Sequence, residues 1–80
     1  MNTKNNRRRR ASIERIEKVF IELLQTKELQ EITVSDICKL CELNRSTFYA
    51  NFIDIYDLAD KVREHLEEEV DRLYEAEKTQ

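Results

Sequence analysis

The 80-residue sequence contains no glycine and no proline. Tight turns, β-bulges and left-handed loop positions favour glycine, so we expect an all-α fold. A chain of this length builds one small core, which predicts a single domain. The absence of glycine also leaves no phosphate-binding loop or oxyanion turn, and no serine, histidine and acid set has a plausible pocket. The sequence therefore argues against an enzyme.

Metal ligands and long apolar segments are also scarce. The cysteines are Cys38 and Cys41 and the one histidine is the distant His65, so thiols and imidazole cannot supply four zinc ligands. On a helix the two cysteines share one face, which favours core packing over a metal or redox pair, and free thiols fit a reducing cytoplasm. No apolar run approaches the ~20 residues of a membrane span, and no signal-peptide core is present. We expect a cytoplasmic protein without a cofactor.

The net charge of −3 is unevenly distributed along the chain. The first ten residues hold five cations and no acid: Lys4, Arg7, Arg8, Arg9 and Arg10. This leaves nine of the 14 cations against all 17 acids in residues 11–80. We predict a flexible basic arm over residues 1–11, with nucleic acid as its first candidate partner and a solubilising tail as the alternative.

Apolar spacing predicts a first helix over about residues 12–26, with Ser12 as its N-cap. Its stripe comprises Ile13, Ile16, Phe20, Leu23 and Leu24. Three further helices are predicted from residues that can cap them: Thr33 before 34–41, Asn44 before 45–51, and Asp54 before a last helix from Ile55. Each cap lies between two apolar residues in hydrophobic-staple positions: Ile32 with Ile37, Leu43 with Phe48, and Ile53 with Leu58.

Only residues 42–44 separate the second and third predicted helices. This is the spacing of a helix-turn-helix motif. We therefore predict a three-helix, homeodomain-like, helix-turn-helix DNA-binding domain over residues 12–60. Residues 61–80 continue the fourth helix as a connecting segment.

The helix over 45–51 has a face suited to DNA. At about 100° per residue, Phe48 and Phe52 fall together and form its core-facing edge. The opposite face and its flanks carry one positive charge and no acid: Arg45, Ser46, Thr47, Tyr49, Ala50 and Asn51. Because the neighbouring sequence is rich in acids, this gap in negative charge favours approach to phosphates, with an ordinary solvated face as the alternative.

Each outer residue has a chemistry that fits a DNA groove. Small Ser46 and Ala50 allow the helix backbone to approach base edges, while Arg45 can bond to guanine O6 and N7. Phosphate contacts are expected from Thr33, Ser35, Tyr49 and Asn51. The arginines of the arm can follow the backbone or enter an adjacent minor groove.

The stretch from Ile32 to Leu58, ITVSDICKLCELNRSTFYANFIDIYDL, resembles the DNA-binding signature of TetR/AcrR-type transcriptional regulators. It joins a Thr-Val-x-x-Ile start, an Arg-Ser-Thr-Phe-Tyr core and a trailing phenylalanine at one spacing. With the preceding helix, the resemblance covers residues 12–60. It implies a sequence-specific regulator, in the family's usual sense a repressor. It also implies base reading by Ser35, Arg45, Ser46 and Ala50, and phosphate contacts by Thr33, Thr47, Tyr49 and Asn51.

Two positions depart from the family pattern. Glu42 stands where the family often has glycine in the turn, which predicts strain at a left-handed position. Ile55 stands where the family often has a phosphate-binding lysine, which predicts a weaker grip on DNA that the arm arginines offset. Family members also carry a C-terminal ligand-binding and dimerisation domain. The resemblance thus implies a homodimer on an inverted repeat for full-length relatives, whereas neither ligand sensing nor strong dimerisation is assigned to this chain.

A protein-interaction module is the alternative function. The last predicted helix keeps a narrow apolar stripe among many charges: Leu58, Val62, Leu66, Val70 and Leu73. Its distal half extends beyond a three-helix core and needs another cover. Residues 57–80 hold nine acids against four bases, which favours a helix-in-groove or dimer surface at this end.

Overall fold

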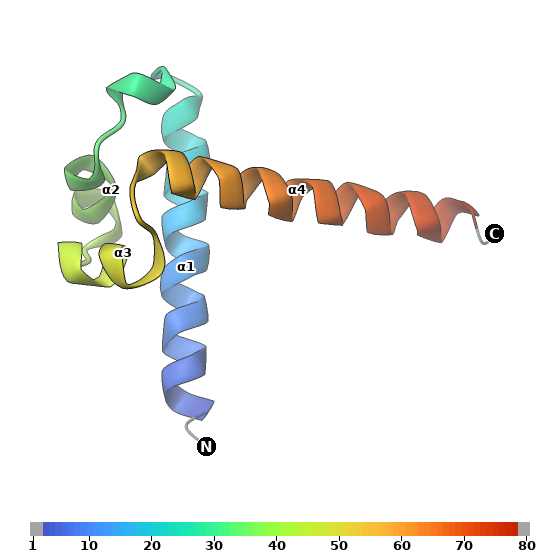
Figure 1. The fold of residues 1–80 in the computed structure, drawn as a ribbon, viewed down its shortest axis with the longest axis horizontal. Helices are drawn as coiled ribbons and strands as arrows, with labels where there is room; N and C mark the ends of the chain where they lie inside the picture. Colours follow the sequence, from blue (N-terminus) through green and yellow to red (C-terminus); the bar gives the residue numbers. More distant parts are fainter. Residues whose placement is uncertain (1–2, 79–80) are drawn as a thin grey trace.

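A computed structural model describes the backbone of residues 3–78 and the side chains of residues 6–78, and within these residues it holds four α-helices and no strand. The helices are α1 (Thr3–Leu24), α2 (Val34–Cys41), α3 (Arg45–Asn51) and α4 (Ile55–Lys78), with a short 3-10 helix, η1 (Leu29–Glu31), before α2. In Figure 1, α2 and α3 lie on one side of α1, whereas α4 crosses α1 and projects to the other side. The predicted all-α fold is confirmed.

One hydrophobic core joins the four helices. Its most deeply buried side chains are Ile16, Phe20, Ile37, Cys41, Phe48 and Leu58. Cys38 is also buried, which confirms that both cysteines pack in the core. Burial raises the pKa of the Cys41 thiol, and its Sγ donates a hydrogen bond to the Arg15 backbone oxygen at 3.7 Å. A buried thiol with a raised pKa is a poor nucleophile, so Cys41 contributes packing rather than reactivity.

The first helix starts nine residues earlier than the sequence predicts. We expected an arm over residues 1–11 and an N-cap at Ser12, but α1 begins at Thr3 and includes the arm residues from there onward. Arginine and lysine are good helix formers, and no glycine or proline separates them from the apolar stripe. The helix that packs on the core therefore continues into the basic segment.

Capping bonds set the start of α2 in the predicted manner. The Asp36 N–H donates to Thr33 Oγ1 at 3.1 Å, and the Thr33 N–H donates to Asp36 Oδ2 at 3.3 Å, which completes a capping box. At the start of α3, Asn44 occupies the predicted N-cap position, but its side chain makes no capping bond. The predicted Asn44 side-chain cap is therefore wrong, although the bounds of both helices are confirmed.

The turn before α4 is held by polar contacts rather than by a hydrophobic staple. Ile53 is 78% exposed, so the predicted packing of Ile53 on the fully buried Leu58 is wrong. Instead, the Ile53 N–H donates to Asp57 Oδ2 and the Asp57 N–H donates to Asp54 Oδ1, both at 2.8 Å. This confirms Asp54 as a side-chain cap. Both acids lie at the positive end of the helix, where the macrodipole favours them.

Candidate nucleic-acid interface

A tight turn at Glu42 sets the angle between α2 and α3. Glu42 has φ 57° and ψ 42°, and it is the one non-glycine residue with positive φ in the described part of the chain. Its N–H donates to the carbonyl oxygens of Cys38 and Lys39, and the Leu43 N–H donates to Cys38 O at 2.9 Å. The expected left-handed position is confirmed, and a residue with a Cβ there costs about 1–2 kcal/mol.

Two phenylalanines hold α3 against the core. Phe48 is fully buried and Phe52 is 3% exposed, which confirms the predicted inner edge. Their ring centroids lie 5.4 Å apart, and the Tyr49 ring meets the Phe48 ring edge-on at the same distance. Tyr49 itself is 54% exposed. The aromatic contacts fix the rotation of α3 about its axis and direct the tyrosine toward solvent.

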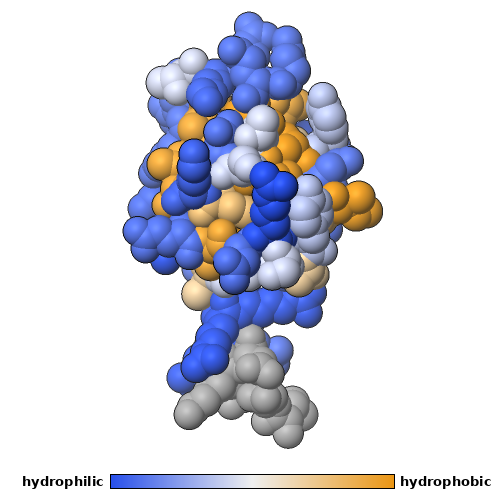
Figure 2. Space-filling view, turned by 90° about the vertical axis from the view of Figure 1, so that its left-hand side faces the viewer, coloured by the Kyte–Doolittle hydropathy of each residue, from blue (hydrophilic) through white to orange (hydrophobic). Residues whose placement is uncertain are grey.

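The outer face of α3 is polar and open. Arg45, Ser46, Tyr49 and Ala50 are exposed, while Thr47 and Asn51 are half-buried at the sides. Figure 2 looks onto the side of the molecule that carries α2 and α3, where hydrophilic and intermediate side chains surround smaller apolar patches. Six of the eight predicted contact residues therefore lie on one short helix. The other two, Thr33 and Ser35, come from the start of α2.

A hydrogen bond connects two of the predicted base-reading residues. Arg45 Nη2 of α3 donates to Ser35 Oγ of α2. The bond crosses from one helix to the other and restrains a guanidinium that is otherwise free to sample many rotamers. Ser35 thus supports the Arg45 side chain at the end of α3 where groove contacts are expected.

The basic end of α1 reaches α3, which the sequence did not predict. Arg9 Nε donates to Asn51 Oδ1 at 3.0 Å, and Asn51 Nδ2 donates to Thr47 O at 2.9 Å. A hollow beside this contact is lined by Arg9, Ser12, Ser46, Thr47, Ala50 and Asn51. The signal was present, because Arg9 lies four and seven residues before Ile13 and Ile16 and so continues their helical face.

The other arm arginines surround the same end of α1. Arg7, Arg8 and Arg10 are exposed, and the Lys4 side chain lies outside the described side chains. In Figure 2, hydrophilic side chains cover α1 where it continues past α3. Positive charge is therefore held on a helix beside the acid-free face of α3, which raises the local attraction for a polyanion.

The start of α4 is unsuited to phosphate binding. The Ile53 N–H before the helix and the Asp57 N–H in its first turn donate to the carboxylates of Asp57 and Asp54, which would also repel an anion. The hydrogen bond from Ile53 and the nearby ammonium of Lys61, 3.1 Å from Asp57 Oδ2, lower the pKa of Asp57. Ile55, at the position of the family's lysine, is buried. The candidate phosphate contacts therefore lie on other parts of the surface.

Most hydrogen-bonding groups of Thr33 are already used within the protein. Its N–H and its hydroxyl oxygen both serve the capping box with Asp36. These bonds lower the pKa of the Asp36 carboxyl, with a smaller effect from Lys27, whose Nζ is 3.6 Å from Asp36 Oδ2. The Thr33 hydroxyl keeps one proton to donate, so a phosphate contact there uses that proton alone.

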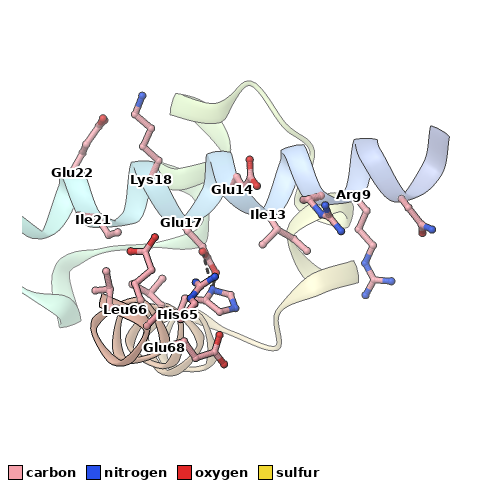
Figure 3. A pocket seen from close by; sticks show the side chains of 15 residues that line it. Arg9, Ile13, Glu14, Glu17, Lys18, Ile21, Glu22, His65, Leu66 and Glu68 are labelled. Carbon is pink, nitrogen blue, oxygen red and sulfur yellow. Dashed lines mark hydrogen bonds and ion pairs between the residues drawn. The ribbon is translucent and has the colours of Figure 1, made fainter. Parts of the chain in front are cut away.

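A second hollow lies in the angle between α1 and α4 (Figure 3). Unlike the hollow beside Arg9 and Asn51, it is lined by both acidic and basic side chains. His65 of α4 points toward Glu17 of α1, with 2.9 Å between His65 Nδ1 and Glu17 Oε2. Acidic and basic side chains alternate around this pair, among them Arg9, Glu14 and Glu68. The mixed charge gives no preference for an anion, so the nucleic-acid candidate remains the α3 face.

Comparisons with known proteins identify no relative of the chain. No family model, curated protein or solved structure matches the chain. Among residues 3–78, no helix combines the length and apolar character that crossing a membrane requires.

Proposed function

We propose that the chain binds double-stranded DNA as a transcriptional regulator of the TetR/AcrR type. In this proposal α2, the turn at Glu42 and α3 form a helix-turn-helix motif, and α3 enters the major groove. A helix about 10–12 Å across fits a groove about 12 Å wide. Repression, an inverted-repeat operator and a dimeric full-length protein belong to the same proposal.

The outer face of α3 is the main support for this proposal. This face is free of acid, rigidly oriented by Phe48 and Phe52, and lies beside Arg9 at the basic end of α1. Arg45, supported by Ser35, is the one long base-reading side chain. The small side chains of Ser46 and Ala50 leave room for base edges to approach.

The phosphate contacts divide between three elements. Thr33 at the start of α2 has a hydroxyl proton to donate, and Thr47, Tyr49 and Asn51 flank the base-reading residues on α3. The helical basic end of α1 supplies the remaining positive charge and takes the place of the phosphate site that α4 lacks. Most of the affinity then comes from charge and depends steeply on salt.

A DNA titration with two matched arginine variants tests the proposal. Fluorescence anisotropy follows binding of the chain to genomic fragments near its gene, over a series of salt concentrations. We expect Arg45→Ala to weaken the tightest binding by about tenfold or more, since a bidentate base contact is worth roughly 1–3 kcal/mol. Arg72→Ala, an exposed arginine on α4, should leave binding unchanged. Equal binding by wild type and Arg45→Ala would contradict the assignment.

A protein-interaction role for α4 is the second candidate function. Leu66, Val70 and Leu73 are 49%, 63% and 68% exposed on the projecting part of this helix. Binding through these residues would depend weakly on salt, because apolar burial is not screened, whereas binding to DNA would fall steeply. The salt series therefore separates the two functions.

A further inference from the structure

An apolar groove runs along one side of α4, where this helix leaves α1. Its walls are side chains of α1 and α4: Phe20, Leu24, Ala59, Val62, Leu66 and Val70. Leu24, Leu66 and Val70 are 42%, 49% and 63% exposed, so much of the groove is in contact with water. Figure 1 shows α4 projecting clear of the other helices at this point. Covering such a surface is favourable, and its charged edge indicates what covers it.

The edge of the groove carries one cation and two acids, Arg63, Glu67 and Asp71, and two of these charges can pair across a two-fold axis. Arg63 and Glu67 lie one helical turn apart along it. If a second α4 lies antiparallel across the groove, with a two-fold axis level with His65, Arg63 of each copy faces Glu67 of the other. Arg63 now pairs with Asp60 of its own helix at 3.4 Å, but both side chains are more than 60% exposed. Because this ion pair is exposed, replacing it with a pair between the two copies costs little free energy.

The same register places apolar side chains in the groove. Leu66 lies next to the two-fold axis and meets Leu66 of the second copy. In this register Val70 of the second copy would lie opposite Ala59, which lines the groove together with Phe20 and Leu24. Val70 of each copy would thus fill the open part of the groove in the other copy, and the two-fold axis repeats this contact on both sides.

The charge of α4 also selects the antiparallel direction. Residues 67–80 carry six acids and two bases, so parallel helices would bring two acidic ends together. In the antiparallel pair the acidic end of each helix lies along the segment of the other that contains Lys61 and Arg63. Repulsion between the acidic ends is lower than in a parallel pair.

We propose that this groove is a self-association surface, which takes α4 of a second copy of the chain in an antiparallel pair. The contact uses the side chains of α4 and the end of α1, and none of the candidate DNA-contacting residues. The inference deepens the second candidate function, the protein-interaction role of α4, and rests on it. Variants in the groove leave the candidate DNA contacts intact, so failure of self-association and failure of DNA binding are distinguishable.

Sedimentation equilibrium of two matched variants tests the groove. Val70→Glu and Ile53→Glu each replace an exposed β-branched side chain, and only the first lies in the groove. We expect wild type to self-associate with increasing concentration, Val70→Glu to weaken the association at least about tenfold, and Ile53→Glu to retain it. A wild type that stays monomeric, or equal loss in both variants, would overturn the proposal. Far-UV circular dichroism confirms that each variant folds.

Charge exchange tests the antiparallel register. Arg63→Glu and Glu67→Arg each place like charges across the two-fold axis and should weaken association about tenfold. The double variant restores both pairs and should recover most of the association. No recovery in the double variant would refute the pairing, since the register requires these two residues to face each other.

Discussion

The left-handed turn at Glu42 gives the sharpest test of how this sequence forms its α2–α3 corner. Relief of the strain at φ 57° by Glu42→Gly is worth about 1–2 kcal/mol, from which the added entropy of the unfolded chain removes about 0.4–1 kcal/mol. These ranges leave a net gain between about 0 and 1.6 kcal/mol, centred on about 0.8 kcal/mol. For a domain of this size a gain of about 0.8 kcal/mol raises Tm by roughly 3–6 °C.

Thermal unfolding followed by circular dichroism measures the gain, and Glu42→Ala is the matched control. Alanine removes the carboxylate from the C-terminal end of α2 but keeps a Cβ in the left-handed region. It should therefore gain only the few tenths of a kcal/mol expected from the helix dipole. If alanine stabilises the fold as much as glycine, the effect is one of charge, and the reasoning from backbone strain is refuted.

Two further predictions concern charge. Because hydrogen bonds hold the pKa values of Asp36 and Asp57 below the ordinary value of 3.8, their stabilisation is complete above that value and is lost as pH falls through the lowered pKa. Asp36→Asn with Asp57→Asn should flatten the acid side of the Tm profile, and an unchanged profile would contradict this. In DNA titrations Arg8→Ala should reduce the slope of log K against log salt by about 0.9, as for one lost phosphate contact. Arg9→Ala should also weaken binding at every salt concentration, since Arg9 supports Asn51; identical behaviour of both variants would contradict that role.

The parts of the fold that follow from local sequence were predictable. The bounds of α2 and α3 follow from caps and apolar spacing, and the capping box in the structure confirms Thr33 as the cap of α2. Ile53 was mispredicted because a staple position is a pattern that the chain need not use. There the carboxylates of Asp54 and Asp57 satisfy the backbone, and the isoleucine stays in water.

The features that depend on distant residues were not predictable. Arg9 and Asn51 are 42 residues apart, and their contact requires both the helical arm and the final angle between α1 and α3. The start of α1 was missed because runs of arginine are common in mobile tails. In the candidate site, a helical wheel of residues 45–51 predicted which residues lie on the outer face of α3. The hydrogen bond between Arg45 and Ser35 could not be predicted from the wheel, because it depends on the turn between α2 and α3.

The helical form of the basic segment changes how its charge can act. A mobile arm contributes positive charge at any position it reaches and loses entropy on binding, whereas a helix tied to α3 holds each arginine at a fixed position before DNA arrives. Successive arginines on a helix point about 100° apart, so Arg9 faces α3 while its neighbours point elsewhere. Only some of them can meet phosphates on one duplex. In the proposed DNA complex, this fixed geometry would reduce the number of phosphate contacts and lower the entropic cost of each one. The start of α4 would not replace the lost contacts, because its acids accept hydrogen bonds there.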